Sequence, residues 1–484
     1  MPEAASVAPY SPRDAPGAVL HAVVRDHLEE FLAAARRHGD GHGVPGFVET
    51  ELRRFLTCGV LAHGFTRVRC DGCGFERLVP FACKGRGFCP SCGGRRMAER
   101  AAHVVDHVLP AAPLRQWVLT VPHRLRYLMA WDHRLCRAVL AVYVRALLGW
   151  YRRRARHAGL TDPRTGTVTA IQRFGGGLNL HVHFHTLVLD GVFTRDAEGA
   201  VRFHTLPPPT DDEVTHVLTT IARRIRRLLA RRGLDPASET EGGLDAGAEL
   251  SPALALVTAG AVQGRQALGQ GAGRAVGRVG RDPAAPWRPP AGGPRQAHQD
   301  GFDLHANVRV GGLDRRGREH LVQYVLRPAL AQARLQRRAD GQVVLQLQRP
   351  WRDGTRALVF SPLAVLERLA ALTPRPRINL LLYHGVLAPN ASWRAAVVPA
   401  PVASAGDPPD DPPARTCTHV SWASLLERVF EVDVLACPRC GQRMRVLATL
   451  EEPAVVHKIL QHVGLPAAPV TPRAPPPDPE LPLW

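Results

Sequence analysis

The chain has 484 residues and a mass of 52.7 kDa, which is too long for one ordinary domain and predicts about three. Its 62 Lys and Arg outnumber 43 Asp and Glu, and the net charge of +19 favours a polyanionic partner over a pocket for an acidic metabolite. Lys84 and Lys458 are the only lysines, so arginine, which suits phosphate and guanine edges, carries almost all of this charge. Nucleic acid is therefore the expected partner.

Neither a membrane span nor a secretory signal is visible in the sequence. No apolar run approaches the roughly eighteen residues of a spanning helix, and the N-terminus lacks the basic, apolar and small-residue order of a signal peptide. We therefore expect a soluble, cytoplasmic protein. In a reducing compartment, ten cysteines are better explained as metal ligands than as disulfides.

The predicted elements, taken in chain order, are those of an α+β protein. Residues 1–45 hold a Pro/Ala leader and an amphipathic helix over Val19–Arg37, and residues 46–110 form a cysteine-rich, basic domain. The larger region over 111–345 begins with a strand-like run, Gln116–Val121. A long helix-like segment, Asp132–Arg156, a hairpin-like pair of runs and an arginine-dense helix, Asp211–Arg232, follow it.

Composition marks the remaining boundaries. Residues 233–300 are rich in Gly, Pro and Ala and predict a flexible insertion. Order returns over Phe302–Val310, a helix near Arg318–Arg338 and strands Val343–Gln348 and Ala357–Phe360, with 346–398 continuing the same region. We expect a linker over 399–413, a C-terminal CxxC module over 414–465 and a disordered tail over 466–484.

Two CxxC pairs in the N-terminal part have the spacing of a structural zinc site. Cys70 and Cys73 are separated by fifteen residues from Cys89 and Cys92, and two such turns can close a tetrahedron of sulfurs around Zn²⁺. Cys58, His63 and Cys83 lie nearby and could replace a ligand or build a second site. Arginines of this module, Arg95 and Arg96 among them, make it a candidate DNA-contacting finger; a solvated basic face around a structural zinc is the alternative.

A further CxxC pair lies near the C-terminus. Cys437 and Cys440 could form a second zinc knuckle, with Cys417, His419 or His457 as additional ligands. A single CxxC is also found as a redox or fortuitous pair. Cys136 stands among apolar residues of a predicted helix and is expected in the core.

The segment from Leu180 to Leu189 is the most informative. In a strand, side chains alternate between faces, so His181, His183 and His185 share one face while Val182 and Phe184 pack on the other. Adjacent imidazoles can bind one metal ion, and a group from another element would complete an open site. In so basic a protein, such a metal would polarise a phosphodiester.

A candidate nucleophile lies further along the chain. Tyr324 belongs to a helix-like stretch rich in basic residues, where cations could activate a phenol and hold phosphate. A tyrosine on a helix is more often a packing residue, so Tyr324 is a candidate nucleophile only in combination with the histidine strand.

These motifs together resemble the HUH-type rolling-circle transposases of bacterial insertion sequences, specifically the IS91-like family with its N-terminal zinc-binding region. The resemblance extends over most of the chain outside the linkers. The segments that carry it are Cys70–Gly74, Cys83–Lys84, Cys89–Cys92, Arg115–Thr120, Asn179–Gly191, Tyr324–Pro328, Pro350–Thr355, Tyr383–Asn390 and Cys437–Gly441.

The resemblance implies an antiparallel-sheet HUH nuclease core with helices, placed between a zinc-binding domain and a C-terminal zinc-knuckle-like module. It makes His183 and His185 the ligands of Mg²⁺ or Mn²⁺, with His181 a third candidate. Tyr324 becomes the nucleophile that cuts single-stranded DNA at a transposon end, leaving a 5′-phosphotyrosine and a free 3′-hydroxyl. Arg327 joins Arg95 and Arg96 as a candidate DNA contact, and the bacterial nucleoid becomes the expected location.

Two features leave alternatives open. Some relatives have two tyrosines four residues apart, whereas His320 and Pro328 occupy those positions around Tyr324. The third metal ligand is unmarked, with Gln172, Gln323 and His181 as candidates. A zinc-dependent DNA-binding or replication-accessory protein without catalysis and a nuclease that uses metal-activated water are the competing functions.

Overall fold

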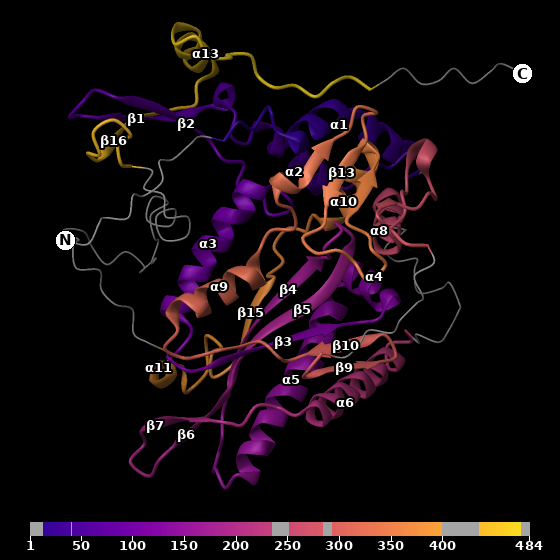
Figure 1. The fold of residues 1–484 in the computed structure, drawn as a ribbon, viewed down its shortest axis with the longest axis vertical. Helices are drawn as coiled ribbons and strands as arrows, with labels where there is room; N and C mark the ends of the chain where they lie inside the picture. The colour runs from indigo at the N-terminus through magenta and orange to yellow at the C-terminus, as the bar shows by residue number, and fades with distance from the viewer. Residues whose placement is uncertain (1–12, 40, 235–250, 284–292, 399–434, 476–484) are drawn as a thin grey trace, which may run out of the picture.

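The computed structural model describes residues 13–39, 41–234, 251–283, 293–398 and 435–475. A seven-stranded antiparallel sheet lies at its centre (Figure 1), with the order β15-β4-β5-β3-β10-β9 and with β11 also paired to β3. The strands are β15 (Leu381–Gly385), β4 (Gly166–Phe174), β5 (Leu180–Leu189), β3 (Leu114–Thr120), β10 (Phe302–His305), β9 (Gln296–Gln299) and β11 (Arg309–Val310). The expected combination of helices with an antiparallel sheet is confirmed.

Strand alternation divides the core into two parts. On one face, Val182 and Phe184 join the main apolar cluster, where Tyr143 of α5 (His133–His157) stacks on Phe184 with ring centroids 6.0 Å apart. On the other face, Leu187 packs with residues of α3 (Pro90–His107) and α9 (Arg315–Leu326). Helix α6 (Asp211–Ala230) covers β9 and β10 and begins with a capping box of Thr210 and Glu213.

Several of the predicted elements agree with the structure. Helix α1 has the expected bounds, Val19–Arg37, and α5 and α6 begin within one residue of the expected positions. The helix expected over Arg318–Arg338 ends at Leu326, because Arg327 precedes a proline and adopts an extended ψ of 148°. The remaining elements of this part are α2 (Gly46–Thr57), η1 (Leu61–His63), α4 (His123–Trp131), β6 (Gly191–Arg195), β7 (Val201–Thr205), η4 (Gln332–Arg334) and α11 (Arg394–Val397).

The prediction of a flexible insertion over 233–300 is wrong for 251–283 and 293–300. Helix α8 (Pro252–Gln263) is largely buried and packs on α10 (Pro362–Leu372), while Gly260 lets the turn after α8 fold back closely, since a Cβ there would lie 3.0 Å from Arg265 O. Strand β8 (Gly277–Val279), preceded by η3 (Gly269–Gly271), joins a four-stranded sheet with β14 (Ala357–Phe360), β13 (Val343–Gln346) and β12 (Leu335–Arg337). Residues 235–250 and 284–292 lie outside the described residues.

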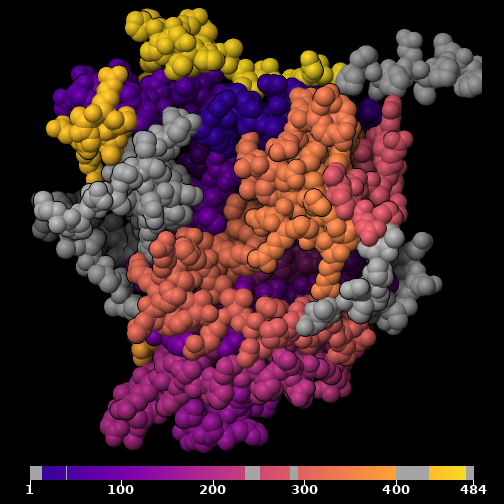
Figure 2. Space-filling view, in the orientation of Figure 1, coloured from indigo at the N-terminus to yellow at the C-terminus, as the bar shows by residue number. Residues whose placement is uncertain are grey.

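The C-terminal segment is not a separate module. Strand β16 (Met444–Leu450) pairs with β1 (Phe65–Cys70), which pairs with β2 (Glu76–Pro80), in one three-stranded sheet. Helix α13 (Pro453–His462) buries Val456 and Leu460 against Phe65. Figure 2 shows this yellow segment against the indigo N-terminal part.

The other predicted boundaries have mixed outcomes. The leader over 1–12 and the linker over 399–413 lie outside the described residues, while the tail is described as far as residue 475, where the Arg473 amide donates to Arg25 O over 2.8 Å. Among the described helices, none combines the length and apolar character needed to cross a bilayer.

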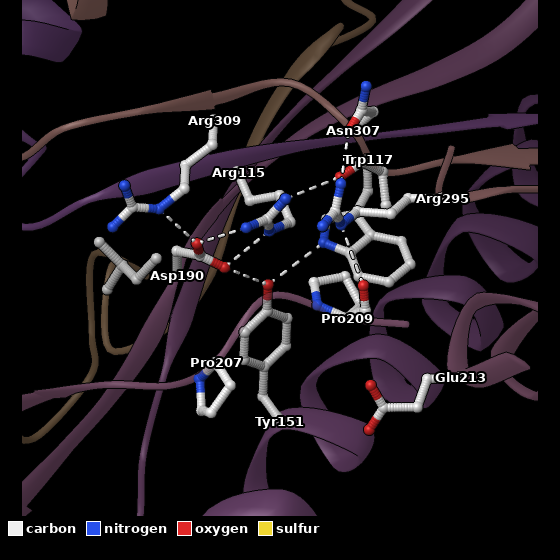
Figure 3. A network of polar contacts seen from close by, with 12 residues as sticks. Arg115, Trp117, Tyr151, Asp190, Pro207, Pro209, Glu213, Arg295, Asn307 and Arg309 are labelled. Atoms are coloured by element: carbon white, nitrogen blue, oxygen red, sulfur yellow. Dashed lines mark hydrogen bonds and ion pairs between the residues drawn. The ribbon is translucent and has the colours of Figure 1, made fainter. Parts of the chain in front are cut away.

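A buried charge network fixes β5 in the sheet (Figure 3). Asp190, which directly follows β5 and is 1% exposed, accepts two hydrogen bonds of 2.8 Å from the guanidinium of Arg115 on β3. The Tyr151 hydroxyl and Arg309 Nε also donate to it, over 3.2 and 2.9 Å, and Trp117 Nε1 donates to Tyr151. Although an Asp-Gly pair is typical of a turn, Asp190 ties β5, β3, β11 and α5 together.

This network predicts that replacing a buried arginine lowers the stability of the fold much more than replacing an exposed one. Arg115→Ala should destabilise the protein by about 3–5 kcal/mol, because it leaves Asp190 charged and buried without its bidentate partner. Arg315→Ala, which removes an exposed pair with Asp106, should cost less than about 1 kcal/mol. Urea unfolding of both variants tests this, and equal stability would contradict the role given to Arg115.

Candidate active site and metal-binding clusters

The three histidines of β5 form a continuous row on one face of the sheet, as the alternation predicts. His183 and His185 are 7% and 4% exposed. His183 Nε2 lies 2.9 Å from His185 Nε2, and His181 Nδ1 lies 3.2 Å from His183 Nδ1. The row therefore brings ring nitrogens together pairwise, with His183 in the middle.

Burial keeps these imidazoles neutral. The pKa of His181 and His185 is lowered to about 2 and that of His183 to about 4, mainly by burial, with a smaller contribution at His183 and His185 from the positive charge of Arg327. The neutral imidazole is the form that binds a metal ion. The row is thus in ligand form at neutral pH.

Two glutamines on the neighbouring strands face the row. Gln116 on β3 bonds to His185, with its amide nitrogen 2.8 Å from Nδ1, and this contact orients the ring. Gln172 on β4 stands directly opposite His183 and donates to Val325 O over 2.6 Å. Its side-chain oxygen is buried without a hydrogen-bond partner, which is costly unless something else binds it. Gln172 therefore offers an oxygen ligand beside His183.

Helix α9 carries Tyr324 to the histidine row. The helix begins at the Asp314 cap, and Arg318 anchors it by donating to Leu109 O and Pro110 O over 3.0 and 2.8 Å. Tyr324 is 48% exposed, and its ring stands edge-on to His185 with centroids 5.9 Å apart. The guanidinium carbon of Arg327 lies 4.4 Å from the centroid of the Tyr324 ring. A solvent-accessible phenol thus lies between an arginine and the buried histidines.

Positive charge gathers beside this site. A cavity of about 130 Å³ lies between α3, β4 and the end of α9, and its lining includes Arg86, Arg96, Arg100 and Arg327. Burial, followed by repulsion from Arg96 and Arg86, lowers the pKa of Arg100. Such crowding of cations is characteristic of a surface that binds an anion.

The predicted DNA contacts differ in their surroundings. Arg327 lies at the tyrosine, whereas Arg96 donates to Gly85 O and Lys84 O over 3.0 and 3.1 Å and so supports the loop that carries Cys83. Arg95 lies on α3 and is partly buried. Gln323 is partly buried beside Tyr324, and Tyr383 is half-buried on β15.

The structure does not bring the expected set Cys70, Cys73, Cys89 and Cys92 together. It divides these cysteines between two clusters, in each of which the four sulfurs lie within 4.8 Å of one another. The first cluster consists of Cys58, Cys83, Cys89 and Cys92, at the end of α2, in the loop after β2 and at the start of α3. Its Sγ atoms include pairs 3.5 to 3.8 Å apart.

The second cluster joins the two ends of the chain. It consists of Cys70, Cys73, Cys437 and Cys440, with Cys70 Sγ 3.5 Å from Cys440 Sγ and Cys73 Sγ 3.4 Å from Cys437 Sγ. Neither His63 nor His457 belongs to a cluster; Cys417 and His419 lie outside the described residues. Cys136 is buried in α5, as expected.

Two family models match the chain. The family described as "Putative transposase" (Y2_Tnp) matches residues 166–394, which hold the histidine row and Tyr324. The family described as "Transposase zinc-binding domain" (Zn_Tnp_IS91) matches residues 23–121, which hold the whole first cysteine cluster. No curated protein and no solved structure matches the chain.

The two matches define a transposase, a class of enzymes that act on DNA. More particularly, the chain belongs to the IS91-like transposases with an N-terminal zinc-binding domain. Tetrads of cysteine sulfur are the ligand sets that structural zinc prefers, so the first cluster and the family that spans it agree on Zn²⁺ as a structural metal.

The buried histidines predict a loss of stability in acid. An unfolded imidazole binds a proton below a pH of about 6.5, whereas His181 binds one only near its lowered pKa of about 2. The unfolded state therefore gains protons first, and stability falls as the pH decreases from about 6.5. His181→Asn should weaken this dependence, while replacing the exposed His320 should not.

Thermal unfolding between pH 7.5 and 4.5, without added Mg²⁺ or Mn²⁺, measures this effect. Identical pH dependence in the His181 and His320 variants would contradict the buried, neutral state of His181.

Proposed function

We propose that the chain transposes DNA by metal-assisted attack of Tyr324 on single-stranded DNA at the ends of its element, in a rolling-circle type of transposition. The observation that carries this proposal is the position of a partly exposed phenol against His185 and beneath Arg327. This position supports the proposal because it would put a nucleophile, metal ligands and a cation for phosphate at one site.

The ligands fit a divalent metal. His183 and His185 are neutral, buried and adjacent, and the unpaired oxygen of Gln172 supplies a hard donor beside them. We propose His183, His185 and Gln172 as the ligands of Mg²⁺ or Mn²⁺, with His181 next to them. Such an ion, when bound, polarises the scissile phosphate.

The chain's own residues perform the remaining chemistry. The Tyr324 oxygen forms a bond to phosphorus as the bond to the 3′-oxygen breaks, which leaves the 5′-phosphate on the enzyme and a 3′-hydroxyl on the DNA. The proton lost by the phenol balances the one gained by the 3′-oxygen. Arg327 lies close enough to Tyr324 to stabilise the charge that develops on the phosphate.

The arginines beside the site support a single-stranded substrate that runs along α3. Arg86, Arg96 and Arg100 crowd the cavity that ends at Arg327, so phosphates there would relieve their mutual repulsion. Tyr324 is the only tyrosine in α9, and the residues four positions before and after it are His320 and Pro328. Strand transfer then requires reuse of Tyr324, a second protomer, or attack by the 3′-hydroxyl.

Tyr324→Phe tests the nucleophile. The variant keeps the aromatic packing on His185 but lacks the attacking oxygen, so it should form no covalent complex with labelled single-stranded DNA from the element's ends in Mn²⁺. Tyr383→Phe, which changes a half-buried phenol on β15, should keep the complex. Denaturing gels measure both variants; cutting by Tyr324→Phe would instead indicate metal-activated water, and binding without cutting by the unmodified chain would favour a non-catalytic DNA-binding protein.

Gln172→Ala tests the metal ligands. Loss of its oxygen should weaken Mn²⁺ binding by about tenfold or more, because a site with three protein ligands binds its ion much more weakly once one ligand is removed. Gln323→Ala, the matched control on α9, should bind Mn²⁺ normally. Titration calorimetry of both proteins decides between the glutamines, and the opposite order of affinities would assign the ligand to Gln323.

A further inference from the structure

The second cysteine cluster combines residues that neither family model spans together. Cys70 and Cys73 lie in the matched range 23–121, but Cys437 and Cys440 follow the end of the other match at residue 394. We propose that these four cysteines hold a Zn²⁺ ion of their own, and that this ion fastens the C-terminal segment to the N-terminal zinc-binding domain.

The two CxxC turns have the same backbone geometry. The Cys70 amide donates to Phe75 O over 2.8 Å and the Gly74 amide to Cys70 O over 2.9 Å. The same pair of bonds recurs at Cys437, which donates to Gln442 O over 2.8 Å and accepts from Gly441 over 2.9 Å. Gly74 and Gly441 both have a positive φ, +70° and +71°. Each turn is thus built to direct two sulfurs at one point.

The spacing of the sulfurs fits zinc better than disulfides. Around a tetrahedral Zn²⁺ with bonds near 2.3 Å, neighbouring sulfurs lie about 3.8 Å apart, and all four sulfurs here lie within 4.8 Å of one another. The contacts of 3.4 and 3.5 Å between the two turns are far longer than a disulfide bond of about 2.05 Å. The shortest contacts each join one turn to the other.

Besides the pairing of β16 with β1 and the packing of α13 on Phe65, only a small core holds the C-terminal segment at the two turns. The buried cluster around the turns contains only Val68, Cys70, Cys437 and Met444, and Val446 on β16 is 58% exposed. Metal binding would add the stabilisation that so small a core lacks. Arg439 over Phe75 and Arg445 paired with Asp71 then become parts of the N-terminal basic surface. The ion would thereby extend the N-terminal zinc-binding domain with residues from the C-terminal segment.

The zinc content of the purified full chain tests the proposal. The double variant C437S/C440S should lose one zinc ion per chain and keep the ion of the first cluster, and the double variant C70S/C73S should lose the same single ion. Combining the four substitutions should remove no more. Cys136→Ser, which changes a buried thiol outside both clusters, should keep all zinc. Full zinc in C437S/C440S would overturn the proposal.

Thiol alkylation provides a second measurement that needs no variant. Cys73 and Cys440 are exposed, so in the zinc-loaded chain they should resist iodoacetamide only if a metal holds their sulfurs. Adding a chelator should make both reactive, as read by mass spectrometry of the peptides, and should speed proteolytic release of the segment that contains β16. Rapid alkylation of both thiols in zinc-loaded protein would also overturn the proposal.

Discussion

The site depends on the alternation of side chains along β5, which lies between β3 and β4 in the central sheet. A strand with neighbours on both sides has fixed register, so its apolar residues must face α5 while the histidines face α9. A shift by one residue would bury the imidazoles in the apolar layer. The bonds of Asp190 to β3, β11 and α5 oppose such a shift and hold His183 opposite Gln172 and His185 next to Tyr324.

The positions of the two helices around the sheet explain how DNA and metal could meet. Helix α9 is anchored at one end by Arg318 and at the other by the bond from Gln172 to Val325 O. Helix α3 starts at the first cysteine cluster and runs along α9, so the zinc-binding domain and Tyr324 are connected through one helix pair. A metal that orders the start of α3 therefore also positions the arginines beside the tyrosine.

The sequence predicted those features that depend on local periodicity. The histidine face of β5 and the bounds of α1 follow from spacing alone, whereas the antiparallel sheet was expected from the family resemblance. Spacing could not show which cysteines share a cluster, because the two N-terminal CxxC pairs already have the spacing of one zinc site. The sulfur that contacts Cys70 belongs to Cys440, 370 residues away in the sequence. Cys58 and Cys83, which were alternatives in the sequence, are the actual neighbours of Cys89 and Cys92.

The region 233–300 and Asp190 show a second limit of prediction from the sequence. Helix α8 is composed of small apolar residues that give little periodic signal, yet they allow close packing on α10. Asp190 looks like a turn residue because its partners, Arg115 and Tyr151, are distant in sequence. Gln172 was one of three candidate ligands, and only its unpaired oxygen in the folded chain sets it apart.

The most direct test of the central claim is to identify the residue that becomes joined to DNA. After incubation with single-stranded DNA from the element's ends in Mn²⁺, nuclease and protease digestion would leave a nucleotide on one peptide for mass spectrometry. Our account predicts the modification on Tyr324. A nucleotide on any other residue, or cleaved DNA with no modified peptide, would contradict it.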